Sequence, residues 1–255
     1  WQDLLHVAKT KREFDKHLPS FIQKVKTIPK IKDLNACPKV LVTGDFFVRY
    51  DSFFIDRIHQ LYTAKGIILK PVDFNELLLY LLARDFEEAA LKVDSQPYSR
   101  RALFKVLSRC LGSNGKTILA SLGAFKVLER AERKAREKFK PTGLLFAQEN
   151  NLGNVITQAS FHIHPSIWGE GVLTIGKVLE TLTQNYDGVL ILGPFSCLPF
   201  RLSEAILRPL CFENQLPFLT YETDGRIPPP TFLRSVAVHI QQVLRIYEKN
   251  QNTQI

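Results

Sequence analysis

The segment Gly188-Val-Leu-Ile-Leu192 is the clearest strand in the sequence. A short, continuous run of β-branched and leucine side chains is typical of a strand that is buried on both faces, as in a parallel sheet. Gly193-Pro-Phe-Ser-Cys-Leu-Pro199 follows it directly, and a helix is predicted to begin near Leu202. Open parallel sheets place ligands in loops at the carboxyl ends of their strands. The loop that contains Cys197 is therefore the first candidate for a functional site.

The rest of the chain alternates strands and helices around this segment. Lys39-Val-Leu-Val-Thr-Gly44 predicts a second buried strand, and the amphipathic run 53–65 with Ile67-Ile-Leu-Lys-Pro71 completes a βαβ unit. Further elements are predicted as helices at 172–182, 202–210 and 231–248 and a strand at 216–221. This alternation predicts an α/β fold, a parallel sheet with helices on both faces.

The same pattern suggests a division of the chain. We expect residues 1–36 to form an amino-terminal helical arm, which Pro19 divides into two helical pieces. Residues 37–248 are predicted to form the α/β domain, with a helical insertion at about 75–140. Residues 249–255 are predicted to be a polar tail.

Composition narrows the class of protein. The 255 residues are 45% hydrophobic and 23% charged, which indicates a globular chain and excludes a disordered one. No apolar run approaches the ~20 residues that span a bilayer, so we expect a protein without a membrane segment. The four cysteines are too widely spaced for a disulfide framework, which favours a cytoplasmic location. The chain begins at Trp1, so we expect it to be a processed or truncated product. It also contains no Met, and the omission of modified methionines from the sequence is one possible cause.

The formal net charge is +9, and the basic excess lies in predicted helices. Basic surfaces can bind nucleic acid or a phosphorylated cofactor. In residues 126–140, however, acidic side chains interleave with the basic ones at helical spacing. No aromatic-plus-basic recognition motif accompanies the charge, so solvated helix faces are the favoured interpretation and nucleic-acid binding is the weaker one.

Two further motifs are considered and set aside. Gly112-Ser-Asn-Gly-Lys-Thr117 resembles a phosphate-binding loop, but Cys110 stands where that loop needs glycine, and a predicted helix replaces the preceding strand. His162-Ile-His164 would place two imidazoles on one face of a strand, which suits a metal. No Cys, Asp or Glu lies close enough in sequence to complete a ligand set, and Pro165 favours a loop edge.

The cysteines differ in their surroundings. Cys197 lies between a strand and a helix, and a helix amino terminus stabilises the thiolate that binds metal or attacks an electrophile. The alternative is a small buried apolar side chain, and position alone does not decide between them. Cys110 and Cys211 lie on apolar faces of predicted helices, and Cys37 lies in a turn before Pro38. These three are expected to be structural.

Several segments carry a resemblance to a known family. In order along the chain they are Val40-Leu-Val-Thr-Gly-Asp-Phe-Phe-Val-Arg49, Gly169-Glu-Gly-Val-Leu-Thr-Ile-Gly176, Asp187-Gly-Val-Leu-Ile-Leu-Gly-Pro-Phe-Ser-Cys-Leu-Pro199 and Pro217-Phe-Leu-Thr-Tyr-Glu-Thr-Asp-Gly225. Together they resemble the carboxyl-terminal half of the 2-hydroxyacyl-CoA dehydratase component family, which includes CoA activase-related proteins. The similarity covers roughly residues 38–248.

The resemblance implies a Rossmann-like (flavodoxin-like) domain and a 4Fe–4S cluster that passes an electron from an ATP-dependent activator to a 2-hydroxyacyl-CoA. Cys197 matches the family's last cluster ligand, Asp224 matches the acidic residue after the final strand, and Asp45 stands where many relatives have Glu. The residues expected to line this site are Gly193, Pro194, Phe195, Ser196, Pro199, Gly169, Glu170 and Gly171.

The chain also departs from the family. No amino-terminal domain with Cys-x-Pro motifs is present, so we expect either a fragment or a chain that gives one ligand to a site completed by another chain. Cys37 is a weaker candidate for a second ligand, because it precedes its strand. The basic excess is expected to help attract CoA phosphates or an acidic activator. The alternative function is a cluster-less scaffold domain for protein–protein interaction.

Overall fold

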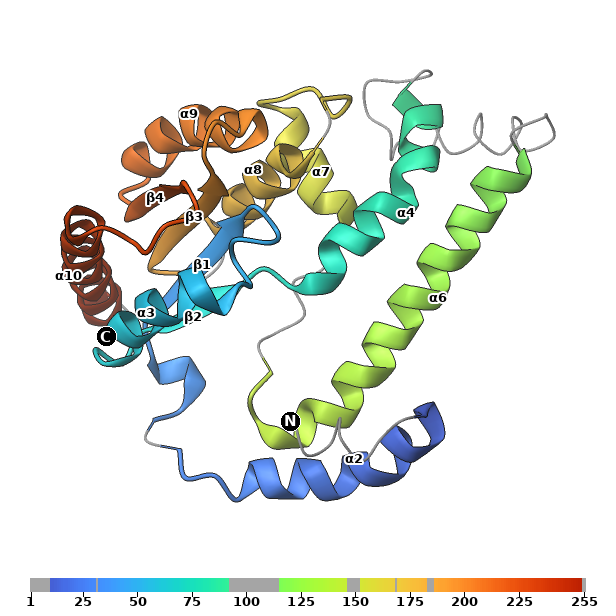
Figure 1. Cartoon of the computed structure of the whole chain (residues 1–255), viewed down its shortest axis with the longest axis horizontal. Coiled ribbons are helices and arrows are strands. Elements are labelled where there is room, and N and C mark those ends of the chain that lie inside the picture. Colours follow the sequence, from blue (N-terminus) through green and yellow to red (C-terminus); the bar gives the residue numbers. More distant parts are fainter. Residues whose placement is uncertain are drawn as a thin grey trace. The chain divides into compact units, whose positions relative to one another are not determined.

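The structure, a computed structural model, describes residues 10–30, 32–91, 115–145, 152–167, 169–182 and 186–253. The chain divides into two compact units, residues 1–36 with 126–149 and residues 37–125 with 150–255. The elements, shown in Figure 1, are α2 (Lys11–Lys26), η1 (Leu34–Ala36), β1 (Lys39–Gly44), α3 (Ser52–Thr63), β2 (Ile68–Pro71), α4 (Phe74–Leu91), α6 (Gly115–Phe139), η2 (Lys140–Thr142), α7 (Leu152–Ser160), α8 (Glu170–Thr181), β3 (Gly188–Pro194), α9 (Leu198–Glu213), β4 (Phe218–Thr223) and α10 (Pro230–Thr253).

The larger unit is built on an all-parallel sheet, which in the described residues has the strand order β2-β1-β3-β4. Val40 to Gly44 of β1 pair with Gly188 to Leu192 of β3. The chain thus runs outward from β1 to β2 and then crosses back to β3 on the other side of β1. This confirms the predicted α/β fold of the Rossmann-like or flavodoxin-like kind. The carboxyl ends of β1 and β3 form its topological switch point.

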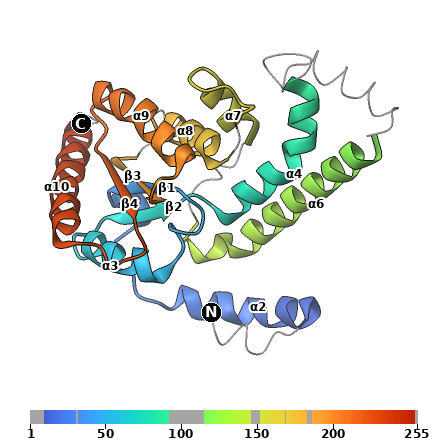
Figure 2. The same ribbon diagram turned by 45° about the horizontal axis from the view of Figure 1, so that its top comes forward.

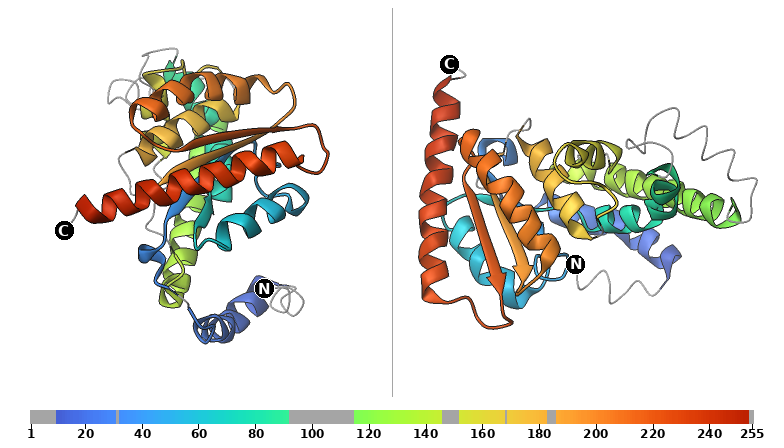
Figure 3. Two further views of the ribbon diagram at one scale, coloured as in Figure 1. Left: turned by 90° about the vertical axis from the view of Figure 1, so that its left-hand side faces the viewer. Right: turned by 90° about the horizontal axis from the view of Figure 1, so that it is seen from above.

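Helices cover both faces of the sheet, as Figures 2 and 3 show. Val40, Val42, Leu190 and Leu192 lie in one core cluster with apolar side chains of α3 and α10. Their neighbours in the strands point to the opposite face, because side chains alternate along a strand. There α8 packs against β1, and α9 packs against β3 and β4. Helix α7 packs on α8.

A buried histidine lies within the first of these faces. The Nδ1 atom of His239 on α10 lies 2.6 Å from the hydroxyl oxygen of Tyr62 on α3, and both side chains are almost fully buried. Burial lowers the pKa of His239 to about 4, although a hydrogen bond with the backbone of Pro217 offsets part of the effect. The imidazole is therefore neutral at pH 7, and the His239–Tyr62 pair has a structural role in the core.

The smaller unit has a separate apolar cluster. Leu18 and Ile22 of α2 are buried, and Phe14, Phe21 and Phe139 pack against them. Thr10 and Glu13 form a capping box at the start of α2, and Lys30 donates to the carbonyl of Thr142 at 2.8 Å. The apolar cluster and the Lys30 hydrogen bond join α2 and the residues after it to the segment 139–142, which is distant in sequence.

Some element boundaries differ from the predictions. Helix α2 is continuous through Pro19, because the buried face on either side of the proline holds the helix together. Helix α9 begins at Leu198 rather than near Leu202, and α10 continues to Thr253 through most of the predicted polar tail. Helix α7 was not predicted. The helix that was predicted to precede Gly112, and residues 112–114 of the glycine-containing motif, lie outside the described residues.

Within the described ranges, none of the helices combines the length and the apolar character that crossing a membrane requires.

The His239–Tyr62 pair predicts a measurable pH dependence of folding. The pKa of His239 is about 4 in the folded state and about 6.5 when unfolded, so the unfolded chain binds more protons between these values. The free energy of unfolding should therefore fall by up to about 3 kcal/mol as the pH drops through this window. In the His239→Gln variant this part of the fall should be missing, as measured by urea denaturation at pH 7 and pH 4.5.

Substitution of the exposed His164 by Gln is the matched control and should leave the pH dependence of the wild type. If His239→Gln and wild type lose the same free energy between the two pH values, the buried histidine is not the cause.

Candidate functional site

The site begins where β1 meets β3 at the carboxyl edge of the sheet. Gly44 has a φ of +100°, and a Cβ atom at this position would lie 2.0 Å from the carbonyl oxygen of Leu192. Only glycine allows this approach. The next residue, Asp45, donates its N–H to the same carbonyl at 2.7 Å, and its Oδ1 accepts from Val48 N–H at 2.9 Å. The loop after β1 is thus fixed to β3.

Glu170, the first residue of α8, holds the same loop from another side. Its Oε1 and Oε2 lie 3.0 and 2.9 Å from the N–H of Phe46, which donates to this carboxylate. Burial raises the pKa of Glu170 to about 7, and the hydrogen bond from Phe46 offsets part of the effect, whereas Asp45 adds to it. An acidic group that titrates near neutral pH can give or take a proton under physiological conditions.

The amino termini of α8 and α9 meet beside this carboxylate. Gly169 has a φ of +106°, and Cβ atoms at Gly169 and Gly171 would lie 3.0 and 3.2 Å from Pro199. Ser203 on α9 lies 3.4 Å from the carbonyl of Gly171. The two glycines therefore allow α9 to pack close to the start of α8. This contact brings the Gly169–Gly171 turn and the Cys197 loop to one place.

The loop between β3 and α9 is held by its neighbours. Phe195 donates its N–H to the carbonyl of Thr223 at 2.8 Å. Ser196 has a φ of +61°, a conformation that is uncommon for residues other than glycine. Its N–H donates to Glu222 Oε1 at 2.7 Å, and the other oxygen of Glu222 pairs with Arg201 on α9. Strained residues of this kind concentrate at binding sites and loops that must keep one shape.

Cys197 is the residue immediately before α9. It is half-buried, it occupies the amino-terminal cap position of the helix, and its side chain forms no capping hydrogen bond. Asp224 lies beyond the end of the neighbouring strand β4, is exposed, and accepts from Arg226 N–H at 3.1 Å. The sulfur thus stands at the positive end of a helix dipole, at the edge where parallel sheets bind ligands.

Arg49 and the aromatic side chains around it form a group that was not predicted from the sequence. The Arg49 side chain is only 4% exposed, and its Nη1 donates to the Gly44 carbonyl at 3.0 Å. The guanidinium lies 5.7 Å from the ring centroids of both Phe46 and Tyr50. Its Nε is buried with no hydrogen-bond partner among the described residues. An arginine five residues after a buried strand is the only sequence signal for this group.

A buried ionic cluster lies on α4 and α8 and was also not predicted. The Nζ of Lys177 is 2.8 Å from Glu180 Oε2 and 3.8 Å from Glu76 Oε2. Burial raises the pKa of Glu76 to about 7, while the charges of Lys177 and Arg49 oppose the rise. Asn154 of α7 donates to the other oxygen of Glu180 at 3.1 Å. The cluster joins three helices next to the candidate site.

The described cysteines do not come together. Cys37 precedes β1 at the amino edge of the sheet, whereas Cys197 follows β3 at the carboxyl edge, so a strand length of roughly 20 Å separates their levels. Cys211 is fully buried in α9, and burial raises the pKa of its thiol to about 12. Cys110 lies outside the described residues.

The paired histidines also differ from the interpretation as a strand. His162 and His164 lie in exposed turns after α7, and His164 Nδ1 is 2.6 Å from the hydroxyl of Ser166. In the part of the chain that the structure describes, no group of three or more His, Cys, Asp or Glu side chains could hold a metal ion.

Comparison of the chain with protein-family models, with curated proteins and with solved structures gave no match.

The Glu170–Phe46 contact can be tested through stability. Because the folded pKa of Glu170 is raised from 4.5 to about 7, ionisation of this carboxyl lowers stability as the pH rises through that range. Glu170→Gln keeps an acceptor for the Phe46 N–H but cannot ionise. The variant should therefore gain about 1 kcal/mol relative to wild type between pH 5 and pH 8, a value reduced for partial exposure.

Glu170→Ala leaves the Phe46 N–H without its partner and should lose roughly 1–2 kcal/mol at pH 5 relative to the Gln variant. Denaturation curves at the two pH values measure both effects. Equal pH dependence of wild type and Glu170→Gln would contradict the raised pKa.

The ionic cluster predicts unequal effects of its two ends. Lys177→Met leaves two buried carboxylates without their cation and should lower the free energy of unfolding by roughly 3–5 kcal/mol at pH 8. Glu76→Gln leaves the Lys177–Glu180 pair intact and should cost less than half of that amount. Urea denaturation measures the free energy of unfolding of the two variants. Equal losses in Lys177→Met and Glu76→Gln would mean that the three charges are not coupled.

Proposed function

We propose that this chain is the α/β domain of a protein of the 2-hydroxyacyl-CoA dehydratase component type, and that Cys197 is a ligand of a shared 4Fe–4S cluster. The single observation that carries the proposal is the position of Cys197, half-buried with no capping hydrogen bond, at the start of α9 and at the carboxyl edge of the sheet. The sequence resemblance around residues 187–199 supports it. The domain would take part in ATP-driven electron transfer to an acyl-CoA.

The surroundings of Cys197 support a thiol held in a fixed position. Glu222 and Arg201 hold the loop on one side, and Pro199 packs against the glycines at the start of α8 on the other. Cys197 occupies the amino-terminal cap position of α9. Ser196, with its strained positive φ, immediately precedes Cys197 and turns the chain into α9. Together these contacts fix where the thiol stands rather than leaving it on a free loop.

The described residues alone do not fit a whole cluster, which requires four ligands, usually cysteine thiolates. Cys37 and Cys211 lie too far from Cys197 to join it. The proposal therefore requires an amino-terminal domain or a partner chain that supplies the other cysteines, and an ATP-dependent activator. The net charge of +9 would favour association with CoA phosphates or with an acidic activator.

A second candidate function is a scaffold without a cluster. It is favoured by the large apolar side chains on either side of Cys197, because Phe195 is 72% and Leu198 67% exposed. Exposed apolar groups gathered at one edge are typical of surfaces that bind other proteins. In this alternative the loop would hold its shape for a protein partner, and Cys197 would have no metal.

Anaerobic reconstitution of the full-length protein with iron and sulfide tests the first proposal. The wild type should bind iron and gain visible absorbance, and Cys197→Ala should lose most of both, because a thiolate ligand is removed. Cys37→Ser is the matched control, since it removes a cysteine from the opposite edge of the sheet, and should retain both signals.

Full iron content in Cys197→Ala would refute the assignment of Cys197. A folded wild-type protein that takes up no iron in the presence of its partner chain would refute the cluster and favour the scaffold. Circular dichroism of each variant establishes that the fold is retained.

A further inference from the structure

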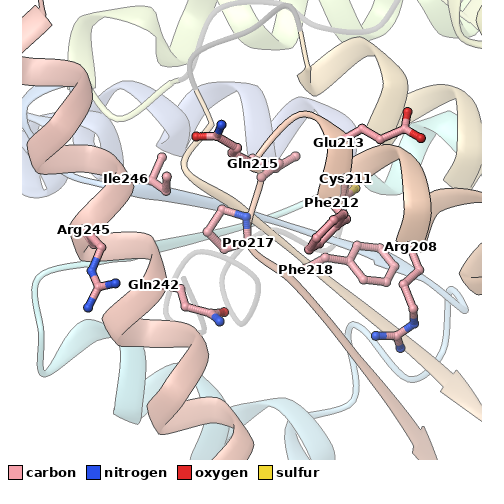
Figure 4. Close-up of a pocket in the computed structure, with 11 residues that line it drawn as sticks. Arg208, Cys211, Phe212, Glu213, Gln215, Pro217, Phe218, Gln242, Arg245 and Ile246 are labelled. Carbon is pink, nitrogen blue, oxygen red and sulfur yellow. The ribbon is translucent and has the colours of Figure 1, made fainter.

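We propose that a groove at the amino edge of the sheet binds a small amphipathic anion, a carboxylate that carries an apolar chain or ring. The groove lies between the end of α9, the start of β4 and the second half of α10 (Figure 4), and its volume is about 580 Å³. This is within the range of small-molecule sites, roughly 300–1,000 Å³. Cys197 lies beyond the opposite edge of the sheet, so the groove is separate from the candidate cluster site.

The end of α9 creates the apolar part of this groove. Gln215 adopts a φ of +54°, and Leu216 donates its N–H to the carbonyl of Cys211 at 2.9 Å, which ends the helix. The chain then turns through Leu216 and Pro217 into β4. Phe212 remains outside the core with 83% of its side chain exposed. An aromatic ring left in water beside a groove gains free energy when an apolar ligand covers it.

Two arginines determine the sign of the ligand. Arg245 of α10 is exposed and, among the described residues, forms neither a hydrogen bond nor an ion pair. Arg208 of α9 lies over the ring of Phe218, with its guanidinium carbon 5.4 Å from the centroid, and pairs with Glu204. Glu213 is the only acidic side chain that lines the groove among the described residues. A carboxylate at Arg245 would form charge-assisted hydrogen bonds in place of the guanidinium's contacts with water.

The arrangement of these groups fits an elongated ligand. Figure 4 shows Phe212 and Phe218 together on the α9 side and Arg245 with Gln242 on the α10 side, with Pro217 between them. In Figure 4 the Arg245 guanidinium is directed away from Pro217, so this exposed side chain must swing toward Pro217 before one ligand can contact both the guanidinium and the two rings. Gln242 offers a second hydrogen-bond donor beside the arginine. A cation would not pair with the arginine on the α10 side, and a fully polar anion would gain nothing from the rings on the α9 side.

Decanoate is a suitable probe, because it combines one carboxylate with one apolar chain. Isothermal titration calorimetry with the purified chain should detect binding of decanoate, and decanoate should displace the fluorescent dye anilinonaphthalene sulfonate. Arg245→Gln should weaken decanoate binding roughly tenfold, the effect of one charge-assisted hydrogen bond. Phe212→Ser should weaken it by a similar factor through the lost apolar contact.

Arg234→Gln is the matched control, since Arg234 is also an exposed arginine of α10 but does not line the groove. Its affinity for decanoate should equal that of the wild type. Decyltrimethylammonium, which has the same chain and the opposite charge, should bind at least tenfold more weakly than decanoate. Since Phe212 and Arg245 are both exposed, their substitution should leave the circular dichroism spectrum unchanged.

Three results would each overturn the proposal: no binding of decanoate by the wild type, equal affinity of wild type, Arg245→Gln and Phe212→Ser, or equal affinity for the cationic and anionic chains. The groove is remote from Cys197, so none of these three results depends on whether a cluster is bound.

Discussion

The close approach of Gly44 to Leu192 is the constraint on which the rest of the candidate site depends. A side chain at residue 44 would collide with the Leu192 carbonyl, and the same carbonyl accepts the Asp45 N–H. This contact joins the ends of β1 and β3, the two strands from which the chain departs in opposite directions. Without it the loops after these strands would have no fixed separation, and the side chains they carry could not form one site.

Further contacts fix the positions of the loops themselves. Glu170, at the start of α8, accepts a hydrogen bond from the loop after β1. Pro199 of α9 packs against the glycines on either side of Glu170. Glu222 then holds the Ser196 amide from the end of β4. Four segments that are distant in sequence therefore meet around Cys197 through backbone donors and close packing. Such preorganisation keeps the entropic cost of binding low, because the groups are already in place.

The two edges of the sheet have different electrostatic characters. At the carboxyl edge, the half-buried Glu170 and the buried Glu76 have raised pKa values, and a buried arginine lies among aromatic rings. At the amino edge, exposed arginines border an apolar groove. Buried charges with few partners are expensive to maintain, so their retention near one edge fits a site whose ligand or partner would interact with them. The amino edge fits a ligand that binds reversibly, because the arginines there remain hydrated.

The strands and their alternation with helices could be predicted from the sequence, because short apolar runs such as Val189–Leu192 are typical of strands that are buried on both faces. The position of Cys197 at a strand end followed from the same reasoning. Only the tertiary structure decided that Pro199 fits against Gly169 and Gly171, that Glu170 binds Phe46, and that Arg49 and Lys177 are buried. These contacts join residues as much as 124 positions apart, and no local pattern encodes them. Likewise, the continuity of α2 through Pro19 depends on a packed face that propensity does not include. Local sequence thus indicated most of the strands and helices, whereas the burial of single side chains and the meeting of distant loops depend on packing between those elements.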